Sequence, residues 1–115
     1  MIDELLINTT ISVVIPCYKE KTHVLDVLKK IPGYVNYIYC VDDGCPDETG
    51  KYIEENYNDS RVKAIFHDKN MGVGAAMITG YEAALNDGSK IVVKIDGDGQ
   101  MDPELIPKFI YPIIN

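Results

Sequence analysis

The chain has 115 residues, enough for one small domain, and its formal net charge of −7 and isoelectric point of about 4.6 make it acidic. An acidic protein repels phosphate backbones, which argues against a nucleic acid or an anionic membrane surface as its partner. Three cysteines without a Cys-x-x-Cys spacing indicate neither a disulfide framework nor a zinc ribbon, and no apolar run approaches the roughly 20 residues of a membrane span.

The first half of the chain alternates two predicted strands with two predicted helices. Residues 11–16 are apolar and β-branched, which predicts a buried strand. Apolar residues then recur at helical spacing over 24–31. A second apolar strand covers 37–41, and Asp47 is placed to cap a helix over 48–56.

The second half repeats this alternation. Residues 61–66 form the third predicted strand, and small residues over 72–86 predict a long helix that lies close on the sheet. A fourth strand over 91–95 leads into 102–104, which has the cap, proline and acid of a helix start. Apolar strands joined by helices predict one α/β domain over 1–115, with a doubly wound, mostly parallel sheet of about four strands and helices on both faces.

Polar ligand groups follow the fourth strand at Asp96, Asp98 and Gln100. On its own, Asp-Gly-Asp-Gly is good turn chemistry, and the segment alone favours a turn. Carboxylate and amide oxygens are also hard ligands suited to Mg²⁺ or Mn²⁺, and open α/β sheets bind ligands at the carboxyl ends of their strands. A calcium loop of the EF-hand type is excluded, because Met101 and Pro107 stand at its required Gly and Glu positions.

Two other loops are expected at the same edge of the sheet. Asp42 and Asp43 follow the second strand, where an acid can hydrogen-bond a base or a ribose. Tyr18 could stack on a base and Glu20 could accept a hydroxyl, although each loop alone would be read as a turn or a surface loop. The glycines of 70–74 favour close packing, since a dinucleotide fingerprint would follow the first strand.

Four segments in order resemble the amino-terminal half of family 2 glycosyltransferases, in particular the branch of dolichol-phosphate mannose synthase and polyprenyl-phosphate glycosyltransferases. They are residues 12–20, 41–47, 70–74 and 96–104. Each motif alone is weak, but together they are specific and span nearly the whole chain. The resemblance implies the Rossmann-like GT-A fold that binds nucleotide-sugars.

The resemblance also implies roles for individual residues. The implied nucleotide-sugar-binding residues are Pro16, Tyr18, Glu20, Asp42, Asp43, Asn70, Asp96 and Asp98. Asp42 or Asp43 would lie near the base, and Asp96 would face the ribose or the first phosphate. Asp98, helped by Gln100, would hold Mg²⁺ or Mn²⁺ against the diphosphate, where a divalent ion neutralises the leaving group.

The implied function is inverting, metal-dependent transfer of a sugar from a UDP- or GDP-sugar, with a polyprenyl phosphate as one candidate acceptor. The family's acceptor-binding half lies beyond these motifs, so no catalytic base is identified. We expect a donor-binding domain truncated before that half, in the cytoplasm or at the cytoplasmic face of a membrane. A nucleotide-sugar-binding module without turnover remains the alternative. A receiver domain is disfavoured, because its acid pair would follow the first strand.

Four other residues carry weaker expectations. Lys19 stands where the family usually has Asn, and Cys45 where it usually has Ser, with altered hydrogen bonds in the loops as the expected effect. His23 and His67 are isolated in the sequence, and a solvated or capping role is expected for both.

Overall fold

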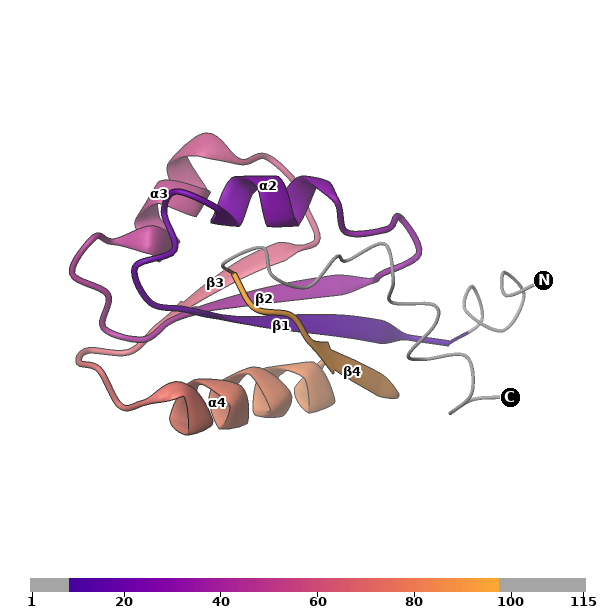
Figure 1. Ribbon diagram of the computed structural model, residues 1–115. Coiled ribbons are helices and arrows are strands. Elements are labelled where there is room, and N and C mark those ends of the chain that lie inside the picture. Colours follow the sequence, from indigo (N-terminus) through magenta and orange to yellow (C-terminus); the bar gives the residue numbers. More distant parts are fainter. Residues whose placement is uncertain (1–8, 98–115) are drawn as a thin grey trace.

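The centre of the molecule is a parallel sheet. The computed structural model describes residues 9–97, and within them four strands lie in the order β3-β2-β1-β4, as Figure 1 shows. The strands are β1 (Ile11–Cys17), β2 (Tyr37–Asp42), β3 (Val62–Phe66) and β4 (Ile91–Lys94). The predicted fold class is confirmed.

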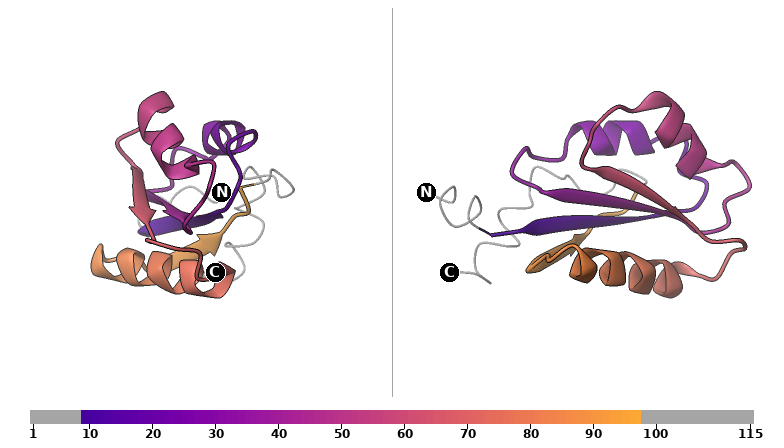
Figure 2. Two further views of the ribbon diagram at one scale, coloured as in Figure 1. Left: turned by 90° about the vertical axis from the view of Figure 1, so that its left-hand side faces the viewer. Right: turned by 180° about the vertical axis from the view of Figure 1, so that it is seen from behind.

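Helices cover both faces of this sheet. α2 (Val24–Lys29) and α3 (Thr49–Asn56) lie on one face, and α4 (Val73–Asn86) lies on the other (Figures 1 and 2). The chain steps from β1 to β2 to β3 in one direction and then crosses back to the other side of β1 to form β4. Because right-handed crossovers change face when the direction reverses, α4 is on the opposite side from α2 and α3. Such a reversal leaves a crevice at the carboxyl ends of the two strands that flank it, here β1 and β4.

The core explains why β1 reads as a continuous apolar run. Val13 and Ile15 belong to the cluster under α2 and α3, whereas Val14 points to the cluster under α4. All three side chains are fully buried. A strand covered on both faces needs apolar residues at successive positions rather than at alternate ones.

The ends of two helices differ from the predictions. The first predicted helix stops at Lys29, because the N–H groups of Lys30 and Ile31 bond to carbonyls only three residues back and tighten the last turn. The N-cap position of α3 is Glu48, in a left-handed conformation, one residue later than predicted. The carboxylate of Asp47 nevertheless accepts hydrogen bonds from the backbone N–H and the hydroxyl of Thr49, the first residue of the helix. The predicted helix start at 102–104 lies outside the described residues. Within residues 9–97, no helix has the length and apolar character to cross a membrane.

α4 approaches the sheet closely at Gly80. A Cβ atom placed there would lie 2.3 Å from Cγ1 of Val14 and 2.9 Å from its Cγ2, which is inside van der Waals contact. Gly74, six residues earlier in the same helix, has no atom within 4 Å of the corresponding position. A substitution at Gly80 therefore tests the packing of α4 against the sheet, whereas a substitution at Gly74 tests the flexibility of the backbone alone.

Gly80→Ala is expected to lower the free energy of unfolding by about 1–3 kcal/mol, because the added methyl group overpacks the helix against β1. Gly74→Ala is expected to raise it by about 0.5–1 kcal/mol, since alanine restricts the unfolded chain and favours the helix. Urea denaturation of both variants beside the parent chain measures the two changes. A stabilised Gly80→Ala variant would show that α4 does not seat on Val14 as described.

Candidate functional site

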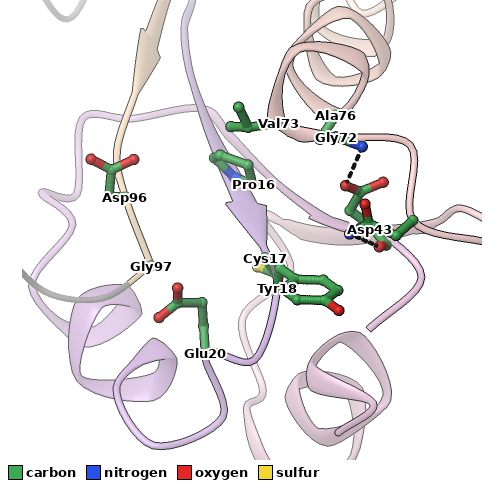
Figure 3. A pocket seen from close by; sticks show the side chains of 11 residues that line it. Pro16, Cys17, Tyr18, Glu20, Asp43, Gly72, Val73, Ala76, Asp96 and Gly97 are labelled. Carbon is green, nitrogen blue, oxygen red and sulfur yellow. Dashed lines mark hydrogen bonds between the residues drawn. The ribbon is translucent and has the colours of Figure 1, made fainter. Parts of the chain in front are cut away.

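A cavity of about 340 Å³ opens at the carboxyl ends of the strands, where β1 and β4 flank the reversal of strand order (Figure 3). It is lined by residues from the loops that follow β1, β2, β3 and β4. Among them are the predicted residues Pro16, Tyr18, Glu20, Asp43, Asn70 and Asp96. The other lining residues, which were not predicted, are Cys17, Gly72, Val73, Ala76 and Gly97.

The Asp43 carboxylate is the most constrained group of this cavity, with its side chain only 5% exposed. Its Oδ1 accepts the backbone N–H of Met71 at 2.9 Å and lies 2.8 Å from Nδ1 of His67. Its Oδ2 accepts the N–H of Gly72 at 2.9 Å, and its main-chain carbonyl accepts from Nδ2 of Asn70 at 3.2 Å. The end of β2 is thereby tied to the entry of α4.

His67 connects this carboxylate to α4. An ionised carboxylate only accepts hydrogen bonds, so the Nδ1 of His67 carries the hydrogen that Asp43 accepts. In the neutral ring, Nε2 then accepts from the Thr79 hydroxyl, which is 2.8 Å away. The His67 side chain is 10% exposed, so the prediction of a solvated or capping role was wrong.

The protonation of Asp43 follows from these contacts. Burial alone would raise the pKa of its carboxyl group. The hydrogen bonds from His67 and from the amides of Met71 and Gly72 outweigh burial and hold this pKa below its ordinary value. Asp43 is therefore a fixed, ionised acceptor at neutral pH.

Asp42 has a different environment, although it is adjacent in sequence. Its Oδ1 accepts the N–H of Cys45 at 2.8 Å and its Oδ2 accepts the N–H of Gly50 at 2.8 Å. Both bonds organise the turn into α3, and the residue is 4% exposed. Asp42 is absent from the lining of the cavity, so the structure brings Asp43 to the candidate site but not its neighbour.

The two departures from the family pattern touch each other. Lys19 has a left-handed backbone (φ 59°), a conformation that asparagine tolerates better than lysine, and its N–H lies 2.8 Å from Sγ of Cys45. The same sulfur contacts Oδ1 of Asp47 at 2.6 Å. This thiol therefore joins the loop after β1 to the turn after β2. It helps to hold Tyr18, which is 42% exposed, at the mouth of the cavity.

The exit of β4 brings a second carboxylate to the cavity. Asp96 is about half exposed and its Oδ1 lies 3.4 Å from Nζ of Lys94. A Cβ atom at Gly97 would lie 3.2 Å from Cγ of Glu20, so a larger residue there would press on the loop after β1. Figure 3 shows Asp96 and Glu20 on the same side of the cavity. Carboxylate oxygens there have the chemistry that Mg²⁺ or Mn²⁺ prefers.

The predicted metal ligands, Asp98 and Gln100, lie outside the described residues. Within residues 9–97, no three His, Cys, Asp or Glu side chains are grouped so that they could hold a metal ion. A metal site at this edge therefore needs oxygen ligands from beyond Gly97, from the ligand itself, or from both.

Comparisons with known proteins show which family the chain resembles. The profile described as glycosyl transferase family 2 matches residues 12–115. The chain is 39% identical to a UDP-N-acetylglucosamine–dolichyl-phosphate N-acetylglucosaminyltransferase of Methanococcus voltae, covering 91% of this chain and 47% of that protein. It is 36% identical to a dolichol-phosphate mannosyltransferase of Pyrococcus furiosus, covering 91% and 30%.

Solved structures show the same fold. Glucosyl-3-phosphoglycerate synthase from Mycobacterium tuberculosis, in complex with Mn²⁺, UDP and glucosyl-3-phosphoglycerate, matches with a TM-score of 0.75 and 21% identity, over 99% of this chain and 43% of that one. S. aureus TarS 1-349 in complex with UDP matches with a TM-score of 0.71 and 23% identity, over 91% and 32%. The chain thus spans less than half the length of these matching proteins.

The stability of the Asp43 network should depend on pH. Because the folded pKa of Asp43 is depressed, its stabilisation is present above the ordinary value of about 3.8 and is lost as pH falls through the lower folded pKa. Asp43→Asn is expected to cost about 1–3 kcal/mol of unfolding free energy at pH 7, because backbone donors lose an acceptor. The deficit should shrink below about pH 4.

Urea denaturation at pH 7 and pH 3 measures both differences. The exposed Asp68→Asn is the matched control, and it should change stability by less than about 0.5 kcal/mol. An Asp43→Asn deficit that stays constant between the two pH values would contradict an ionised Asp43.

Proposed function

Because the chain belongs to glycosyl transferase family 2, we propose that it is the donor-binding part of an enzyme that transfers a sugar from a UDP- or GDP-sugar. The observation that carries this proposal is the cavity at the carboxyl ends of the strands. It gathers an exposed aromatic ring, a fixed carboxylate and a second carboxylate, on Tyr18, Asp43 and Asp96. These groups come from loops far apart in the sequence, and open α/β sheets bind nucleotides at such a place.

Each side chain has a role that suits its surroundings. The ring of Tyr18 is exposed enough to stack on a base, while Pro16 closes the cavity beside it. Asp43 accepts a donor from the base or the ribose. Glu20 and Asn70 also line the cavity, and their polar groups are the proposed partners of sugar hydroxyls.

A divalent ion, Mg²⁺ or Mn²⁺, belongs to the proposal. Asp98 would hold it, with Gln100 beside it and Asp96 facing the ribose or the first phosphate. When bound, the ion neutralises the charge that develops on the nucleoside diphosphate as it leaves. The crystals of the mycobacterial synthase, which contained Mn²⁺ together with UDP, support this part of the proposal by analogy.

The acceptor is proposed from the relatives. Two of them are named for transfer to dolichyl phosphate or dolichol phosphate, so a polyprenyl phosphate at the cytoplasmic face of a membrane is the proposed acceptor of the whole protein. The phosphate oxygen of such a lipid is already ionised at neutral pH. Direct displacement with inversion at the sugar therefore requires no strong base in the donor-binding part.

Thermal-shift measurements test donor and metal binding together. A correct donor at about 100 times its Kd is expected to stabilise the chain by about 2.7 kcal/mol, or about 10 °C in Tm, in the presence of Mn²⁺. UDP- and GDP-sugars with and without Mn²⁺ provide the screen. Asp98→Asn should remove the metal-dependent part of the shift, because the ion loses a charged ligand.

The matched control is Asp26→Asn, an exposed acid on α2 that does not line the cavity, which should retain the full shift. If Asp98→Asn kept all of the Mn²⁺-dependent stabilisation, the assignment of Asp98 to the metal would be wrong. If no nucleotide-sugar stabilised the parent chain, the proposed function itself would fail.

A further inference from the structure

Most of the acceptor capacity of Asp43 is used within the protein. An ionised carboxylate offers about four lone-pair positions. Among the described residues, His67 and Met71 occupy both positions of Oδ1, at 2.8 and 2.9 Å. Gly72 occupies one position of Oδ2 at 2.9 Å. Asp43 lines the cavity (Figure 3), so it can offer a ligand there one remaining acceptor position, on Oδ2.

This arrangement resists change. The Nε2 of His67 is 2.8 Å from the Thr79 hydroxyl on α4, so turning the ring away from Asp43 would break hydrogen bonds at both nitrogens. The ring is 10% exposed, and water has little access to replace those bonds. The main chain of Asp43 is also held, because its N–H donates to the carbonyl of Cys17 at 3.1 Å. The carboxylate therefore cannot turn to present two free oxygens.

Resting on the proposed function, we propose that His67, by occupying Asp43, makes the cavity select a nucleoside diphosphate whose base has a single ring N–H donor, uracil or thymine. Uracil presents N3–H between two carbonyl groups, which matches one acceptor. Guanine presents N1–H beside an amino group. With one acceptor position, the carboxylate can bind only one of these two donors, and the other is left without a hydrogen-bond partner. Cytosine presents a ring acceptor at the same place, which the carboxylate repels.

The surroundings make this mismatch costly. Pro16, Val73 and Ala76 give the cavity an apolar wall. A donor buried beside such a wall without a partner weakens binding by about 10- to 100-fold. His67 acts through Asp43, so it is a positioning residue for base selection.

Isothermal titration of the chain with UDP, GDP and CDP in the presence of Mn²⁺ tests the inference. UDP is expected to bind about tenfold or more tightly than GDP, and CDP is expected to bind weakly. In His67→Phe the carboxylate is free to present both oxygens, and the UDP-to-GDP affinity ratio should narrow by about tenfold. His67→Asn keeps a nitrogen donor at the position of Nδ1, so it should restore the parent ratio.

The ratio of two affinities in one protein is insensitive to a partly unfolded fraction, which lowers both affinities alike. His23→Phe is the matched control, because His23 is an exposed histidine at the start of α2, and its ratio should equal that of the parent. If His67→Phe does not fold, Thr79→Val provides the second variant. It removes the hydrogen bond at Nε2 of His67, so the ring is held less firmly against Asp43, and the UDP-to-GDP affinity ratio should narrow to a smaller extent.

Three outcomes would overturn the inference. Equal or tighter binding of GDP by the parent chain would contradict it while leaving nucleotide binding intact. An unchanged ratio in folded His67→Phe would show that His67 does not set the choice of base. Failure of the parent chain to bind any nucleotide would remove both the proposed function and the selection that rests on it.

Discussion

The hydrogen bonds of the buried Asp43 carboxylate hold the candidate site together. They join the end of β2, the loop over 70–72 and, through His67, the side of α4. Burying a carboxylate is costly, and here two backbone amides and a histidine compensate for the lost water. Because the same group lines the cavity, the contacts that stabilise the fold also limit the acceptor positions that this carboxylate presents to the cavity.

The reversal of strand order places the remaining groups. β1 lies between β2 and β4, so the loops that follow these strands meet at one edge of the sheet although they are up to 80 residues apart. Gly80 lets α4 lie close to β1, and Gly97 leaves room for Glu20. The cavity is thus a product of topology and of a few small residues. The chemistry comes from the polar side chains of the loops.

The strands, their alternation with helices along the chain and the parallel sheet could be predicted, because near-continuous apolar runs separated by helical periods have few other interpretations. The different roles of Asp42 and Asp43 could not be predicted, since both are aspartates and they are adjacent in the sequence. Only the partners that each carboxylate meets after folding separate them: the turn into α3 for one, and residues 24 to 29 positions away for the other. His67 was misjudged for the same reason, because its partners lie 24 and 12 residues away and leave no local pattern.

The central claim is that the cavity built around Asp43 is the nucleotide site. Amide chemical-shift mapping of the ¹⁵N-labelled chain, titrated with UDP and Mn²⁺, tests it most directly. The largest shifts are expected at Tyr18, Asp43, Gly72 and Asp96, which line the cavity. Shifts concentrated instead at Asn36 and Lys90, next to the amino ends of β2 and β4, or no shifts at saturating UDP, would contradict the account.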